Sequence, residues 1–163
     1  MSRTVLAVAL SSMGVAVACS NVAPSLPSDV PATVAGVPTE RVALTQWLES
    51  GAFRSWTGDA SPRPPEQDSP HGSVRVFFNP TVEDSLRHDT VPRPVGSVLV
   101  KEVYSGGSVE GHAMMLKVRE GPSGNDWLFY EAFGSSTSTY DLGAGGCTGC
   151  HVRGRDFVRS TLP

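Results

Sequence analysis

Residues 97–104 read Ser-Val-Leu-Val-Lys-Glu-Val-Tyr and have the clearest strand pattern in the chain. Valine is frequent here, and successive side chains of a strand point to opposite faces of its sheet. Lys101 therefore shares a face with Leu99 and Val103, which is unusual for a lysine that faces solvent. The alternative is an edge lysine whose aliphatic stem covers apolar surface while its ammonium group reaches water.

Three other segments have the composition of strands: 73–79, 112–119 and 127–133. Residues 120–125, between the last two, have the glycines and polar side chains of a hairpin loop, and the polar, glycine-rich residues 135–146 also predict a loop. Consecutive strands with short connections usually pair antiparallel. We therefore expect a single α+β domain built on an antiparallel meander of four to five strands.

Short helices are expected on both sides of this sheet. Residues 39–50 place apolar side chains at helical spacing, with Thr39 as a candidate N-cap and Gly51 as the end of the helix. Two further short helices are predicted over 81–88 and 152–161.

The first 18 residues have the pattern of a secretory signal peptide. Arg3 is the single charge before Asp29, residues 5–18 are almost wholly small and apolar, and Ala16-Val17-Ala18 has the small residues of a cleavage site. A membrane anchor or a buried helix is the alternative interpretation. The apolar run is shorter than the roughly 20 residues that span a bilayer.

Cys19 follows directly, and residues 16–19 resemble a bacterial lipoprotein box, in which the cysteine carries the lipid. An ordinary signal peptidase would instead leave Cys19 as a free N-terminus. Both alternatives predict export, and lipidation would anchor a periplasmic protein to the bacterial membrane. Residues 19–38 contain four prolines and many small side chains, so we expect a tether there and the folded domain over 39–163.

The composition excludes several classes of protein. The chain has 163 residues, about one domain, with 13 Lys+Arg against 16 Asp+Glu and a formal charge of −3. This mild acidity argues against a nucleic-acid-binding protein, in which basic residues cluster. The 3 cysteines are too few for a disulfide scaffold, and an apolar fraction of 39% is too high for a disordered chain.

Residues 147–151 read Cys-Thr-Gly-Cys-His, the attachment motif of c-type haem. Two intervening residues let both thiols reach the two vinyl groups on one porphyrin edge, with which they form thioethers. The next residue, His151, then lies under the iron and supplies an axial nitrogen. The sequence therefore predicts one covalent haem c, held by Cys147 and Cys150 and ligated by His151.

Three other uses of this motif fit the sequence less well. A thioredoxin-like redox pair is expected at the start of a helix in a βαβ unit. A structural zinc site needs four ligands, whereas Cys147, Cys150 and His151 provide three. A plain disulfide would not need His151.

The late position of the motif narrows the class of cytochrome. No Met or His follows His151, so any sixth iron ligand must come from upstream. A β-rich domain with a C-terminal haem motif resembles the cytochrome P-460 family, over about residues 47–157. The landmarks of this resemblance are His71-Gly72 before residues 74–79, Pro94-x-Gly96-Ser97-x-Leu99-Val100-Lys101-Glu102, Gly124-x-Asp126-Trp127-x-Phe129-Tyr130, the haem motif, and Asp156-Phe157-Val158.

The resemblance implies one of two activities. True P-460 cytochromes oxidise hydroxylamine, and the related cytochromes c-prime-beta bind nitric oxide and similar gases. Both are described as antiparallel, usually dimeric haem proteins with an open or weakly occupied distal site. In the hydroxylamine oxidisers a lysine is linked covalently to the porphyrin, and Lys101 matches that position. Lys117 alternates with Met115 and Arg119 and is expected to face solvent.

Several residues are candidates for the distal side of the haem. His112 or Met114 could ligate iron, although packing in the core is the simpler interpretation of both. Phe77 or Phe78 could cap the haem, as distal phenylalanines do in the gas-binding relatives. Only one of these two can face the pocket, because neighbouring strand residues point in opposite directions.

Glu102, Glu110 and Glu131 are candidate proton acceptors for hydroxylamine oxidation. His71 and His88 lie beside loops and are expected to be solvated. Two classes of function remain: a gas-binding or electron-transfer cytochrome, and a hydroxylamine or nitric-oxide oxidoreductase. In both, the expected partners are a small nitrogenous ligand or substrate and a redox protein.

Overall fold

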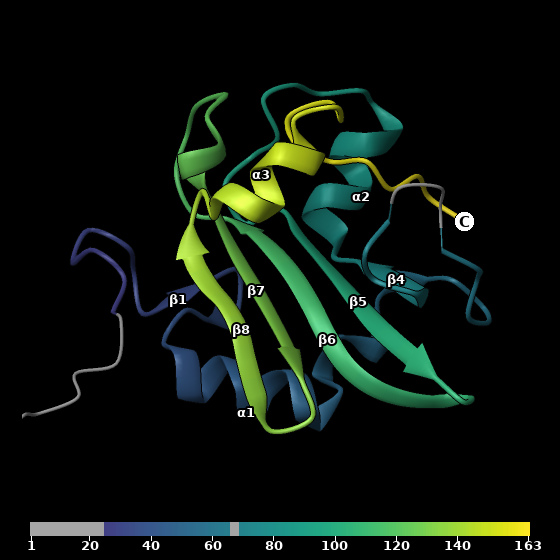
Figure 1. The fold of residues 1–163 in the computed structure, drawn as a ribbon. Helices are drawn as coiled ribbons and strands as arrows, with labels where there is room; N and C mark the ends of the chain where they lie inside the picture. Colours follow the sequence, from purple (N-terminus) through teal and green to yellow (C-terminus); the bar gives the residue numbers. More distant parts are fainter. Residues whose placement is uncertain (1–24, 66–68) are drawn as a thin grey trace, which may run out of the picture.

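A six-stranded antiparallel sheet forms the centre of the fold (Figure 1). The computed structural model describes residues 25–65 and 69–163. The strands lie in chain order and each pairs antiparallel with its neighbours, so the predicted meander and the α+β class are confirmed. The strands are β3 (Thr57–Gly58), β4 (Ser73–Phe78), β5 (Val98–Ser105), β6 (Ser108–Lys117), β7 (Trp127–Phe133) and β8 (Ser136–Leu142).

The prediction of a loop over 135–146 is wrong, because β8 occupies most of it. This strand pairs with β7 from Ser136 opposite Phe133 to Leu142 opposite Leu128. It lies at the edge of the sheet, where polar side chains and charges are usual because one side of the strand has no partner. The apolar alternation that marks a half-buried strand is therefore missing.

The last helix also differs from the prediction. α3 spans Gly145–His151 and contains the Cys-x-x-Cys-His motif itself. No helix follows over 152–161, where Asp156 and Phe157 both have left-handed backbone angles, with φ of 47° and 66°. Such angles cannot occur inside a right-handed helix.

The other helices agree with prediction except at one cap. α1 (Arg41–Ser50) ends at Gly51, but its N-cap is Glu40, whose carboxylate accepts hydrogen bonds from two backbone N–H groups. Thr39 is instead buried and donates to the carbonyl of Pro31 at 2.5 Å. α2 (Pro80–Arg87) is capped by Asn79. Short 3₁₀ turns, η1 (Ala52–Ser55) and η2 (Gly124–Asp126), follow α1 and precede β7.

The prediction of a tether over 19–38 is wrong in its C-terminal part. β1 (Thr33–Val34) and β2 (Val37–Pro38) form a hairpin in which both valines are buried. These valines pack in the core beneath α1, so the folded domain begins before residue 39. The predicted signal peptide over 1–18 and Cys19 lie outside the described residues.

The sheet separates two apolar clusters. The first lies on the face covered by α1 and includes Leu44, Leu48, Val98 and Val100. The second lies on the opposite face, which α2 and α3 cover, and the following residues form it: Val74, Val76, Phe78, Val82, Leu99, Val103, Met115, Trp127, Phe129 and Val158. No helix in the described part of the chain is long and apolar enough to cross a membrane.

Candidate functional site

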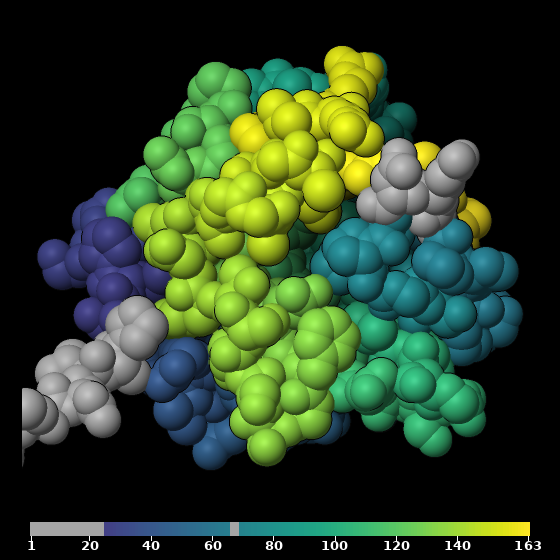
Figure 2. All heavy atoms as spheres, viewed as in Figure 1, coloured from purple at the N-terminus to yellow at the C-terminus, as the bar shows by residue number. Residues whose placement is uncertain are grey.

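A pocket lies between the sheet and the C-terminal segment, on the sheet face opposite α1. Its empty volume, including the open mouth, is about 1210 Å³. Figure 2 shows the recess between the C-terminal segment (yellow), β8 (yellow-green) and the blue-teal segment that precedes β4. β4 to β8 form the floor, α3 forms one wall, and residues 63–64 and 69–71 form the wall opposite it.

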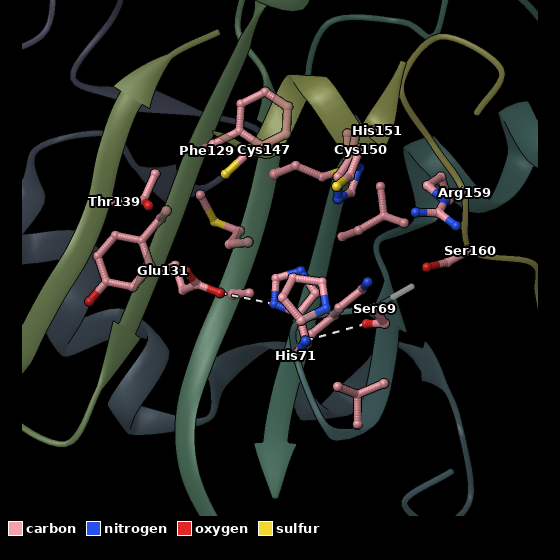
Figure 3. Close-up of a pocket in the computed structure, with 18 of the residues that line it drawn as sticks. Ser69, His71, Phe129, Glu131, Thr139, Cys147, Cys150, His151, Arg159 and Ser160 are labelled. Carbon is pink, nitrogen blue, oxygen red and sulfur yellow. Dashed lines mark hydrogen bonds and ion pairs between the residues drawn. The ribbon is translucent and has the colours of Figure 1, made fainter. Parts of the chain in front are cut away.

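Cys147, Cys150 and His151, the three residues that the sequence predicts to hold a haem, all line this pocket. Cys147, Cys150 and His151 occur at positions i, i+3 and i+4 of α3, which places them on one side of the helix. Both thiols are free and half-buried. Figure 3 shows the three side chains directed from α3 toward the cavity. The motif predicted from sequence is therefore assembled on a single wall.

The imidazole of His151 is held by the backbone that follows it. Its Nδ1 lies 2.8 Å from the carbonyl oxygen of Phe157, to which it can donate, leaving Nε2 with a lone pair. The ring also meets Phe129 edge to face, with centroids 5.6 Å apart. Burial lowers the pKa of His151 to about 4, so the imidazole is neutral at neutral pH. Metal-binding histidines commonly have such a second contact.

The sheet presents a row of pocket-lining side chains at matching positions of four strands. Lys101 of β5 is opposite Ala113 of β6, Ala113 is opposite Glu131 of β7, and Glu131 is opposite Thr139 of β8. All four line the pocket. The prediction that Lys101 faces the same side as Leu99 and Val103 is confirmed. The methyl group of Ala113 leaves room between Lys101 and Glu131, whose Cα atoms are about 10 Å apart at normal strand spacing.

His71 belongs to the pocket, contrary to the expectation that it is solvated. Its Nδ1 lies 2.9 Å from Oε1 of Glu131, and both side chains are mostly buried. Figure 3 shows this pair across the cavity from α3. The contact with His71 lowers the pKa of Glu131, with smaller contributions from the hydroxyl group of Ser138 and the charge of Lys101. His88 is solvated as predicted, with its side chain 70% exposed.

The three candidate carboxylates have different surroundings. Glu131 lines the pocket, whereas Glu102 lies on the α1 face, where its carboxylate is 2.6 Å from Nε of Arg54 and 2.7 Å from the hydroxyl of Tyr104. Glu110 is exposed near the start of β6, where it lines a second cavity. The pocket thus selects Glu131 from the three.

The distal candidates lie mainly on the other face of the sheet. Met114 borders the pocket but packs in the cluster beneath α1. His112 packs edge to face against Phe53 on that same side, with ring centroids 5.7 Å apart. Core packing was the simpler interpretation of both, and it is confirmed. The alternation of side chains along residues 112–118 is sufficient to predict that His112 and Met114 lie on the same face of the sheet.

The prediction of a capping phenylalanine at 77 or 78 is wrong. Phe77 packs in the cluster beneath α1, and Phe78 packs against the other face of the sheet without lining the pocket. Phe129 lines the pocket, and its ring is the one that meets the imidazole of His151. Phe129 lies two residues before Glu131 on β7, so the two side chains point to the same face of the sheet. This alternation could have identified Phe129 as a pocket residue.

The expectation for Lys117 is also wrong. Its side chain is 0% exposed and forms an ion pair with Asp156, whose side chain is 1% exposed. Because Lys117 ends β6 just before the loop to β7, alternation indicated its face but not what covers it.

The arrangement of the motif fits a covalent haem better than the other uses of the motif. Burial raises the pKa of Cys147, whereas redox-active thiols have a lowered pKa, and the surrounding sheet is antiparallel rather than βαβ. Within residues 25–65 and 69–163, no three His, Cys, Asp or Glu side chains converge as a metal site. Two thiols bound to a porphyrin edge and one imidazole bound to iron do not need to converge.

No protein-family model matches the chain, and no curated protein matches it.

Proposed function

We propose that the chain is an exported c-type cytochrome with one haem, attached through Cys147 and Cys150 and ligated by His151. The observation that carries the proposal is the helix that directs both thiols and the imidazole into one pocket, with Nδ1 of His151 bonded to a carbonyl. The bound haem would supply an iron that binds small ligands and exchanges single electrons. Lipidation at Cys19 would tether the protein to the periplasmic side of a membrane.

The pocket residues have separate roles in this proposal. The carbonyl of Phe157 holds the imidazole of His151, and the apolar side chains of Leu99, Met115 and Phe129 exclude water from the floor. Glu131 is ionised, so it can accept a proton from a nitrogenous substrate at the oxygen that does not face His71. These features support a protein that binds or oxidises hydroxylamine or nitric oxide, as the resemblance to the P-460 family implies.

Lys101 distinguishes the enzyme from the alternative, a gas-binding or electron-transfer cytochrome of the c-prime-beta type. Its position on the pocket floor supports a cross-link to the porphyrin. Such a bond would change the electronic properties of the macrocycle, which are what set the chemistry of a haem.

The test is to mature the full chain with haem in a bacterial periplasm and record the intact mass and the ferrous optical spectrum. We expect covalent haem, and a Lys101 cross-link would give a strongly red-shifted Soret band with a mass lowered by loss of hydrogen. Lys101→Ala should abolish both signals while the thioether-bound haem remains. An ordinary c-type spectrum with ready nitric oxide binding would contradict the enzyme, and absence of covalent haem would overturn the whole proposal.

A further inference from the structure

Lys117, at the end of β6, and Asp156, in the segment that follows α3, form an ion pair closed to solvent. Nζ of Lys117 lies 3.0 Å from Oδ2 and 3.2 Å from Oδ1 of Asp156, and both side chains are at most 1% exposed. The ammonium group also donates to the carbonyl of Gly121 at 2.5 Å and lies 4.9 Å from the ring centre of Trp127. The sheet therefore fixes the lysine, and the lysine fixes the carboxylate.

Asp156 is held from a second side as well. The backbone N–H of Arg93 donates to its Oδ2 at 2.7 Å. Asp156 and Phe157 are consecutive residues with left-handed backbone angles, which residues other than glycine rarely adopt. Such a conformation persists where surrounding contacts impose it, and the buried carboxylate provides those contacts.

This backbone conformation determines where the carbonyl of Phe157 points. Its oxygen accepts from Nδ1 of His151 at 2.8 Å. The ring of Phe157 is packed against Gly124, where an added Cβ would lie 3.1 Å from it. The chain of contacts thus runs from Lys117 through Asp156 and Phe157 to His151.

We infer that Lys117 and Asp156 are positioning residues for the axial histidine, because they fix the carbonyl that orients the His151 imidazole. The inference rests on the proposed function, in which Nε2 of that imidazole binds haem iron. A hydrogen bond from the other ring nitrogen fixes the tautomer and raises the basicity of the ligand. A more basic ligand favours the ferric state, so loss of this hydrogen bond should raise the midpoint potential of the haem.

The deciding experiment compares midpoint potentials of the haem-loaded full chain by spectroelectrochemistry. Lys117→Met should raise the potential above that of the wild type, and Lys117→Arg should return it toward the wild-type value. Arg54→Leu is the matched control, because it removes the ion-pair partner of buried Glu102 on the opposite sheet face. It should lower stability and leave the potential unchanged.

A wild-type potential in Lys117→Met, or an equal shift in Arg54→Leu, would overturn the inference. If Lys117→Met does not fold, Asp156→Asn replaces it, because the amide oxygen can still accept from Arg93; a smaller rise is expected, and no rise contradicts the inference. If the wild type holds no haem, the proposed function fails separately. In that case nitrogen-15 chemical shifts of the His151 imidazole in the haem-free chain test the inference. The Nδ1–H tautomer should be present in the wild type and lost in Lys117→Met, or in Asp156→Asn where that variant replaces it.

Discussion

Nδ1 of His71 lies 2.9 Å from Oε1 of Glu131, and this contact joins the segment before β4 to the middle of β7. The pair occupies the side of the pocket that faces α3. It places a carboxylate and an imidazole where a ligand bound in the pocket would meet them. The contact should also change the pKa of Glu131 and, through it, the pH dependence of the protein's stability.

Replacing His71 by Leu should raise the pKa of Glu131 toward the ordinary carboxyl value. The contact with His71 is the largest cause of the lowered pKa in the folded protein. A lowered carboxyl pKa stabilises the fold above the unfolded value of about 4.3, and this contribution is lost as the pH falls through the folded value. His71→Leu should therefore lose less stability in that acidic window than the wild type.

Carbon-13 titration of the glutamate carboxyl groups measures this directly. Glu83 is an internal control, because its pKa is lowered by Thr57 and then Arg87, away from His71. Its titration should be the same in both proteins. If Glu131 also titrates identically in both, the contact with His71 does not form in solution.

Under the proposed enzymatic function, in which Glu131 accepts a proton from hydroxylamine, Glu131→Gln should slow hydroxylamine oxidation by about 10²–10⁴-fold, the usual effect of losing a general base. Covalent haem and nitric oxide binding should be retained, because the substitution is nearly isosteric. Glu110→Gln is the control, since this carboxylate is exposed outside the pocket. Steady-state rates of both variants, normalised to haem content, give the answer. Equal rates in the two variants would remove Glu131 from the mechanism.

The central strands and the face of Lys101 could be predicted because their information is local. Alternation in residues 97–104 decides which side chains share a face, and a sheet that buries one face on each side preserves that pattern. The haem motif is equally local, since a single helical turn brings Cys147, Cys150 and His151 to one wall. β8 could not be recognised in the same way, because it is a polar edge strand without apolar alternation, and it forms by pairing with β7.

The errors at Lys117 and His71 have a different origin. The partner of Lys117 is Asp156, 39 residues later. It lies in a loop whose left-handed backbone positions are Asp156 and Phe157, so no glycine in the sequence indicates this conformation. The partner of His71 is Glu131 on β7. Two strands, β5 and β6, separate β7 from β4, the strand that follows His71. Both pairs exist only once the sheet register is set, so sequence periodicity could not indicate them.

Gly111→Ala should destabilise the fold by about 1–3 kcal/mol or more, as overpacking does in a close-packed interior. An added Cβ would lie 2.2 Å from the carbonyl oxygen of Ala132 and 2.8 Å from the ring of Phe133, where β6 pairs with β7. Backbone cannot retreat there without breaking the ladder. Gly145→Ala is the matched control, because nothing lies within 4 Å of its Cβ; it should be neutral or stabilising by up to about 1 kcal/mol. Urea unfolding compares the two, and equal stabilities would contradict the close approach at Gly111.

Replacing both Cys147 and Cys150 by Ala should cost folding stability as well as colour. The haem would cover the apolar floor formed by Leu99, Met115 and Phe129, so its loss should return that surface to water, at a cost on the order of several kcal/mol. The melting temperature, followed by far-ultraviolet circular dichroism, should fall in the double variant. Cys19→Ala is the matched cysteine control, because it alters the predicted lipid site and leaves the haem attached. A colourless double variant with the same melting temperature as the wild type would show that the porphyrin is not part of the core.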